Sequence, residues 1–136
     1  AHEDAVEILK GNVNKPISHV QPVVGQEEFA ALQTQTNDMY VHEMIYSYIV
    51  TIVEKTRTSE FLSLGASPRG SIAVMKMAKA NAFLEGRDYV TVQDVLENLH
   101  EAAEHRLVLS SRAKAAGQDR GEVLDSIVAY VKAPKA

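Results

Sequence analysis

The sequence predicts an all-α protein, and three observations support this fold class. Apolar residues make up 46% of the 136 residues and aromatic residues only 6%, which is typical of helical bundles with aliphatic cores. Several segments repeat apolar residues at the spacing of one helix face. Several of these segments also follow a Ser, Thr or Asp that suits a helix start. The length fits one compact domain.

The first predicted elements are short. Glu3–Lys10 is predicted to form a helix that stops at Gly11. Residues 12–25 contain two prolines and are interpreted as a linker or an extended crossover. A second helix is expected to begin at about Gln26 and to end before Thr36.

Two longer helices are predicted in the centre of the chain. His42–Thr56 has the clearest amphipathic pattern, with apolar residues forming one stripe along the helix. Residues 58–66 are then expected to form a loop. Ser67 is a preferred N-cap and Pro68 suits the first helical position, so the next helix should begin there. Gly86 lies where a left-handed C-cap is expected.

The C-terminal part carries two further helix starts. Thr91 with Asp94, and Asp119 with Glu122, have the spacing of a capping box. The helix that begins at Thr91 is expected to end at about Leu99. The apolar residues after Glu122 lie on one helix face and predict the final helix.

Strand-like composition is limited to short runs. Met39–Val41 and Tyr89–Thr91 are rich in Tyr and Val, and we hypothesise that they pair and tie the helices together. Residues 106–109 are a further candidate for extended backbone.

The composition excludes several classes of protein. The absence of cysteine excludes disulfides and thiolate metal sites. The net charge of −4, with scattered Lys and Arg, argues against nucleic acid as a partner. No apolar stretch approaches the roughly 20 residues that span a bilayer, and the N-terminus lacks the pattern of a signal peptide. We therefore expect a cytoplasmic segment, cut from a longer protein.

Two motif-like strings do not support catalysis. His100 and His105 are five residues apart and would face different sides of a helix, so no zinc site is predicted. The string at residues 65–70 resembles a nucleophile elbow, but Pro68 has no N–H for an oxyanion hole. The phosphate-binding loop of ATPases is also absent, so the chain alone is not expected to hydrolyse ATP.

Arg69 is the strongest candidate for anion contact. It lies in the first turn of the helix that Ser67 and Pro68 begin, beside N–H groups that favour anions. Its guanidinium suits a phosphate, although a solvated or ion-paired arginine is the common alternative. Arg57, Arg87 and the pair His105–Arg106 are further candidates for nucleotide or inter-subunit contact.

Two strings resemble the C-terminal lid domain of MoxR-type AAA+ ATPases, the family of methanol dehydrogenase regulatory proteins. They are Leu64–Val74, which contains Gly-Ala-Ser-Pro-Arg, and Leu84–Val95. His105–Leu107 is similar to another signature of that family, and Ala5–Leu9 resembles the helix that ends the ATPase core. The likeness covers nearly the whole chain. Gly70 departs from it, because a helix-favouring residue such as Ala is expected there.

The resemblance implies an AAA+ lid-type bundle of about six helices with a small two-stranded β element. Residues 1–36 would hold the end of the ATPase core and the linker, and residues 37–136 the lid. Arg69 would be the sensor-2 arginine, which contacts the γ-phosphate of ATP in the same or a neighbouring subunit. Ser67, Pro68, His105 and Arg106 are candidate supporting residues, and none is predicted to be catalytic.

The family's cofactors and partners follow from the same resemblance. ATP and magnesium would be bound mainly by a core domain outside this chain. The expected partners are that core domain, neighbouring subunits of a hexameric ring, and von Willebrand factor A domain proteins. The expected task is chaperone-like remodelling or cofactor insertion. The alternative is a helical protein-interaction module that does not depend on nucleotide.

Overall fold

The computed structural model describes residues 2–12 and 20–134 of the chain. The chain forms two compact units, Ala1–Leu32 and Gln33–Ala136. In the described ranges, no helix is long and apolar enough to cross a membrane.

The first unit holds helix α1 (His2–Asn12) and the beginning of helix α2 (Gln26–Asn37). Contrary to expectation, α1 continues through Gly11. Glycine near a helix end costs little, because such ends fray in any case. Within the predicted linker, residues 13–19 lie outside the described residues, and residues 20–25 form neither helix nor strand.

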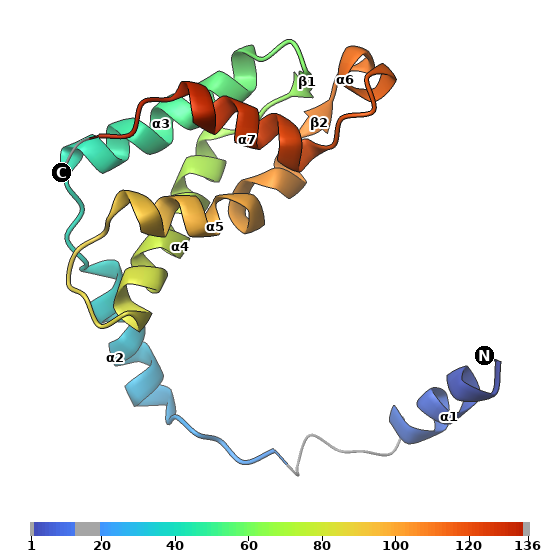
Figure 1. The fold of residues 1–136 in the computed structure, drawn as a ribbon. Helices are drawn as coiled ribbons and strands as arrows, with labels where there is room; N and C mark the ends of the chain where they lie inside the picture. The colour runs from blue at the N-terminus through green and yellow to red at the C-terminus, as the bar shows by residue number, and fades with distance from the viewer. Residues whose placement is uncertain (1, 13–19, 135–136) are drawn as a thin grey trace. The chain divides into compact units, whose positions relative to one another are not determined.

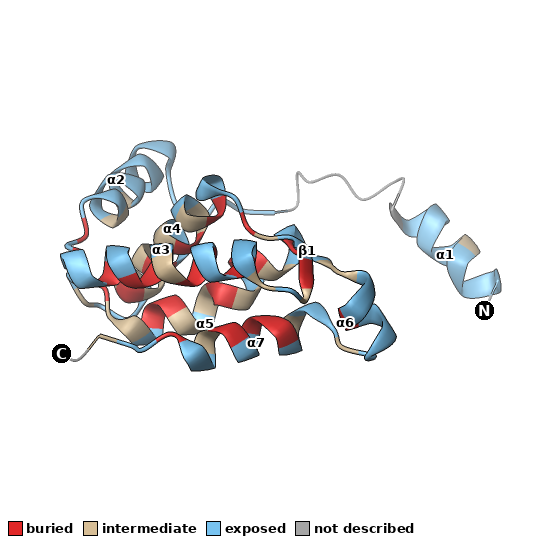
Figure 2. Cartoon of the chain, turned by 90° about the horizontal axis from the view of Figure 1, so that it is seen from above, coloured by how far each residue is buried: buried red, intermediate tan, exposed pale blue. Residues whose placement is uncertain are grey.

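The second unit is built around helices α3 (Glu43–Thr58), α4 (Pro68–Leu84), α5 (Val92–Ala103) and α7 (Arg120–Tyr130), which Figure 1 shows. α4 and α5 pack most extensively, and α3 lies against both α4 and α7. Figure 2 shows the buried faces of these helices turned toward one another. α4 contributes Val74, Ala78 and Ala82, all fully buried at four-residue spacing. Because the two alanines are small, α5 can approach the backbone of α4 closely.

The all-α class is confirmed, and the described residues contain seven α-helices where about six were predicted. The additional helix is α6 (Ser111–Ala115), which Ser110 caps by accepting the Ala113 N–H. α5 runs to Ala103, beyond the expected end, and the short 3-10 helix η2 (Glu104–Arg106) follows it. Ala103 is buried, so packing against the core extends this helix beyond what local pattern predicts.

The small β element is formed by segments other than the two runs that were hypothesised to pair. Strand β1 (Leu62–Leu64) pairs antiparallel with β2 (Val108–Leu109), so the expectation of a loop over residues 58–66 was wrong at residues 62–64. β2 lies within the segment 106–109 that was a candidate for extended backbone. Burial of Leu62 draws this segment into the fold. The hypothesised pairing of Met39–Val41 with Tyr89–Thr91 is present as a single parallel bridge between Tyr40 and Tyr89.

The predicted helix signals at α5 and α7 are confirmed. Both capping boxes form, one between Thr91 and Asp94 and the other between Asp119 and Glu122. Gly86 has φ 72°, the left-handed conformation expected after the end of α4. Local signals therefore set these boundaries, whereas packing sets the end of α5.

His100 joins α5 to α7. Its Nδ1 lies 3.0 Å from Glu104 Oε2, and its Nε2 lies 2.9 Å from Asp125 Oδ1 in α7. A neutral imidazole can donate from only one ring nitrogen, so this arrangement favours the imidazolium. The hydrogen bond to Glu104 is the largest cause that raises the pKa of His100, and the contact with Asp125 adds to it, while partial burial opposes both.

Replacing His100 with glutamine should destabilise the protein in a pH-dependent way. The raised pKa means that the stabilisation by His100 is fully present below about pH 6.5, where histidine is charged even when unfolded. It is lost as the pH rises through the folded-state pKa. Urea unfolding at about pH 5.5 and about pH 8.5 measures this difference. Equal losses in H100Q at both pH values would contradict the charged bridge.

Candidate functional site

The first turn of α4 is fixed in place by Thr56 in the last turns of α3. The Thr56 hydroxyl donates to the Val53 carbonyl at 2.6 Å and accepts the Ala66 N–H at 2.9 Å. Thr56 and Ala66 are both only 1% exposed. A buried polar group without partners would be costly, so the paired hydroxyl specifies where the chain enters α4.

Gly65 permits the close approach that this contact requires. A Cβ atom at position 65 would lie 2.5 Å from the backbone carbonyl carbon and oxygen of Thr56, and 2.6 Å from the N of Arg57. Real Cβ atoms do not come this close to backbone atoms. The glycine in Gly-Ala-Ser-Pro-Arg is therefore required by contact with α3, a role that cannot be predicted from the local sequence.

The helix start at Ser67 and Pro68 is confirmed in position. Ser67 is the N-cap, with extended backbone (φ −82°, ψ 168°), and Pro68 occupies the first helical position. The Ser67 side chain, however, makes no capping hydrogen bond. At the starts of α3, α5, α6 and α7 the N-cap side chain does accept a hydrogen bond from a backbone N–H of the first turn; these N-cap residues are His42, Thr91, Ser110 and Asp119. The positions of Ser67 and Pro68 at the start of α4 are thus confirmed. That they help Arg69 to contact a nucleotide remains a prediction.

Arg69 is exposed in the first turn of α4. Across residues 2–12 and 20–134, no carboxylate or carbonyl pairs with its guanidinium. The common alternative of an ion-paired arginine does not apply in the described part of the chain. Its donors are available to an anion, although the helix dipole disfavours positive charge at this end.

Arg106, the last residue of η2, lies beside the first turn of α4. A Cβ atom at Gly70 would lie 3.7 Å from Arg106 Cδ and 3.2 Å from the Cβ of Ala66. Gly70 is buried, which gives a reason for its departure from the family pattern. The structure therefore brings Arg106 to Arg69's helix turn. His105 is exposed, and among the described residues no hydrogen bond or ion pair joins its side chain to that turn.

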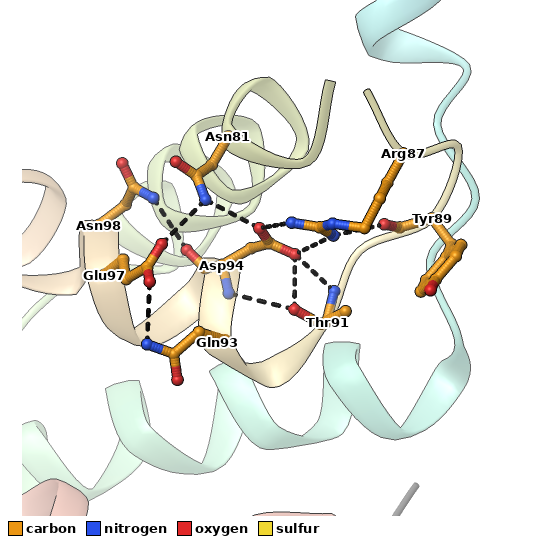
Figure 3. A network of polar contacts seen from close by, with 8 residues as sticks. All are labelled: Asn81, Arg87, Tyr89, Thr91, Gln93, Asp94, Glu97 and Asn98. Carbon is orange, nitrogen blue, oxygen red and sulfur yellow. Dashed lines mark hydrogen bonds and ion pairs between the residues drawn. The ribbon is translucent and has the colours of Figure 1, made fainter. Parts of the chain in front are cut away.

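Arg87 is engaged elsewhere, in the polar network drawn in Figure 3. Its guanidinium donates to both carboxylate oxygens of Asp94, at 2.7 and 2.5 Å, and to the Tyr89 carbonyl at 3.0 Å. Asp94 also accepts from the N–H and hydroxyl of Thr91 and from the Asn81 amide. Arg87 is thus not free for the nucleotide or inter-subunit contact considered above.

The same contacts set the charge state of Asp94. Burial alone would raise the pKa of this carboxyl, but the hydrogen bonds from Arg87, Thr91 and Asn81 outweigh it and hold the pKa well below its usual range. Asp94 is 1% exposed and ionised. The network joins α4, which carries Asn81, to the α4–α5 loop and the start of α5, so polar contacts add to the packing between these two helices.

The described residues contain no group of three or more His, Asp or Glu side chains placed to hold a metal ion. The guanidinium of Arg69 and the two terminal nitrogens of Arg106 have no hydrogen-bond partner among the described residues, and such donors suit an anion such as phosphate.

The class of protein follows from comparison with known proteins. Residues 54–127 match the family model described as the AAA lid domain, which is slightly more than half of the chain. The chain therefore belongs to the AAA lid domain family. A solved structure of a proposed ATPase from Cytophaga hutchinsonii has the same fold, with a TM-score of 0.80 and 26% identity over 99% of this chain.

Two curated relatives indicate which form of the lid this is. The chain is 31% identical over 122 residues to Chaperone MoxR1 of Mycobacterium tuberculosis, covering 83% of this chain. It is 40% identical over 119 residues to the uncharacterized protein YeaC of Bacillus subtilis, covering 88% of this chain. These findings confirm the MoxR-type resemblance. The chain spans only 32% and 37% of these two relatives and 44% of the solved chain.

Proposed function

We propose that this chain is the nucleotide-sensing lid of a MoxR-type AAA+ ATPase. A core domain outside the chain would bind ATP and magnesium, and Arg69 would contact the γ-phosphate. One observation carries the proposal: Arg69 is exposed and unpaired on a helix start that Thr56 and Gly65 hold in place. The backbone at this helix start is held before a ligand arrives, and this supports the proposal because charge on a preorganised backbone acts best on a phosphate.

ATP hydrolysis would then be coupled to movement of the lid. Release of the γ-phosphate removes the anion that Arg69 contacts, so the lid can move as a rigid body against the core. The work of the whole protein would be chaperone-like remodelling or cofactor insertion, as part of a hexameric ring in the cytoplasm. Proteins with von Willebrand factor A domains would be its partners. The similarity to Chaperone MoxR1 supports the chaperone-like part.

Arg69→Ala in the longer protein that carries this chain tests the sensor role. We expect ATP turnover to fall at least about tenfold, since charge-assisted hydrogen bonds to phosphate contribute about 1.5–3 kcal/mol. The free energy of unfolding should change little, because Arg69 is exposed. Arg120→Ala is the matched control, since it also removes an exposed arginine from the first turn of a helix, α7.

The two proposed classes of function give different results. Normal turnover in R69A would show that Arg69 is no sensor and would favour the protein-interaction module. Reduced turnover in R69A, with R120A unaffected, would support the lid function.

A further inference from the structure

The side chain of Arg106 is held near α4 by a single hydrogen bond. Its Nε donates to the Ala102 carbonyl at 2.8 Å, at the end of α5. This bond leaves the two terminal nitrogens of the guanidinium unused, and none of the described residues provides a partner for them. Arg106 is exposed, so these donors face solvent.

The absence of a side chain at Gly70 lets Arg106 lie against the first turn of α4. The methylene Cδ of Arg106 is 3.7 Å from where a Cβ of residue 70 would be. Arg69 is the adjacent residue on that turn. Two arginines from different elements, η2 and α4, therefore reach the same end of one helix, and neither is paired with a carboxylate in the described ranges.

Two arginines that reach the same helix turn add positive charge there, which the helix dipole disfavours. An anion with several oxygens reverses this effect, because each guanidinium can donate two parallel hydrogen bonds to it. A triphosphate has enough oxygens for both. A purely structural reading, in which Arg106 stabilises the C-terminal end of α5, accounts for Nε but not for the free terminal nitrogens.

We propose that Arg106 is a second phosphate-binding residue, which contacts the same ATP triphosphate as Arg69. The inference rests on the proposed sensor role of Arg69 and extends it from one guanidinium to two. Arg106 would then be a determinant of ATP affinity that comes from a different element than the sensor-2 helix.

The experiment measures binding of magnesium-ATP and of a non-hydrolysable ATP analogue to the longer protein that carries this chain. We expect Arg106→Ala to weaken binding about tenfold, and Arg106→Lys to recover part of the loss because charge is kept but the planar fork is lost. Arg112→Ala is the matched control, since Arg112 is an exposed arginine that already pairs with Glu60. The thermal midpoint of R106A should match that of R112A.

A double-mutant cycle tests whether the two arginines bind one ligand. If they do, the loss in R69A/R106A should differ from the sum of the single losses. Losses that simply add would overturn the proposal that Arg106 binds the same ATP as Arg69. The proposal would also be overturned if R106A bound ATP as tightly as R112A while R69A bound it weakly. Neither result would affect the proposed sensor role of Arg69. Normal binding and turnover in R69A would instead remove the sensor role on which this inference rests.

Discussion

Asp94→Ala is expected to lower the free energy of unfolding by about 3 kcal/mol, the lower end of the range for breaking a buried ion pair, because Asp94 is buried whereas the Arg87 side chain is 27% exposed. The substitution leaves the Arg87 guanidinium without its carboxylate and removes the acceptor for Thr91 and Asn81. The N-terminal cap of α5 is lost at the same time. Urea unfolding followed by circular dichroism measures the change.

Asp88→Ala is the matched control, because Asp88 is an exposed aspartate in the same loop. Its loss should change stability by less than about 0.5 kcal/mol. The wild-type protein should also lose stability in acid. Because the folded-state pKa of Asp94 is lowered, its contribution is present above about pH 4 and is lost as the pH falls toward that lowered pKa. Equal stability of D94A and D88A would show that the network contributes nothing.

Gly65→Ala is expected to destabilise the protein by about 1–3 kcal/mol or more, as overpacking does. The new methyl group would overlap backbone atoms of Thr56 and Arg57, which cannot turn away as a side chain can. Relief requires the segment to move away from α3, and that movement stretches the hydrogen bond from Ala66 to Thr56. The start of α4, with Arg69, would be displaced with it.

Gly11→Ala provides the comparison, since nothing lies within 4 Å of a Cβ at that position and its φ is not positive. Alanine is the better helix former, so G11A should be neutral or slightly stabilising. Thermal unfolding of both variants measures the contrast. In the longer protein, G65A should also reduce ATP turnover. A G65A protein as stable as G11A would show that α3 does not constrain the entry to α4.

Helix starts could be predicted from the sequence because their signals are local. Thr91 with Asp94 and Asp119 with Glu122 are three residues apart, and the side chains that cap each helix lie within that span. The start of α4 at Pro68 followed in the same way. The MoxR-type family was also recognisable, since its string at residues 65–70 is contiguous.

Contacts distant in sequence could not be predicted in the same way. The pairing of β1 with β2 joins Leu62 to Leu109, and neither short strand has a distinctive pattern. Thr56 was indistinguishable from other polar residues on α3, because its role depends on Ala66 ten residues later. Arg87 and Arg106 were both candidates for nucleotide contact, and only the fold shows that Arg87 is paired with a carboxylate whereas Arg106 is not.

The length of α4 has a mechanical consequence. Its 17 residues span about 25 Å, at 1.5 Å per residue. One end is anchored to α3 through Ala66, and the part near the other end is anchored to α5 through Asn81. A rod of this length that pivots by about 10° at the Arg69 end sweeps its far end along an arc of about 4 Å. A change at a single phosphate would in this way become a displacement large enough to separate or join two protein surfaces.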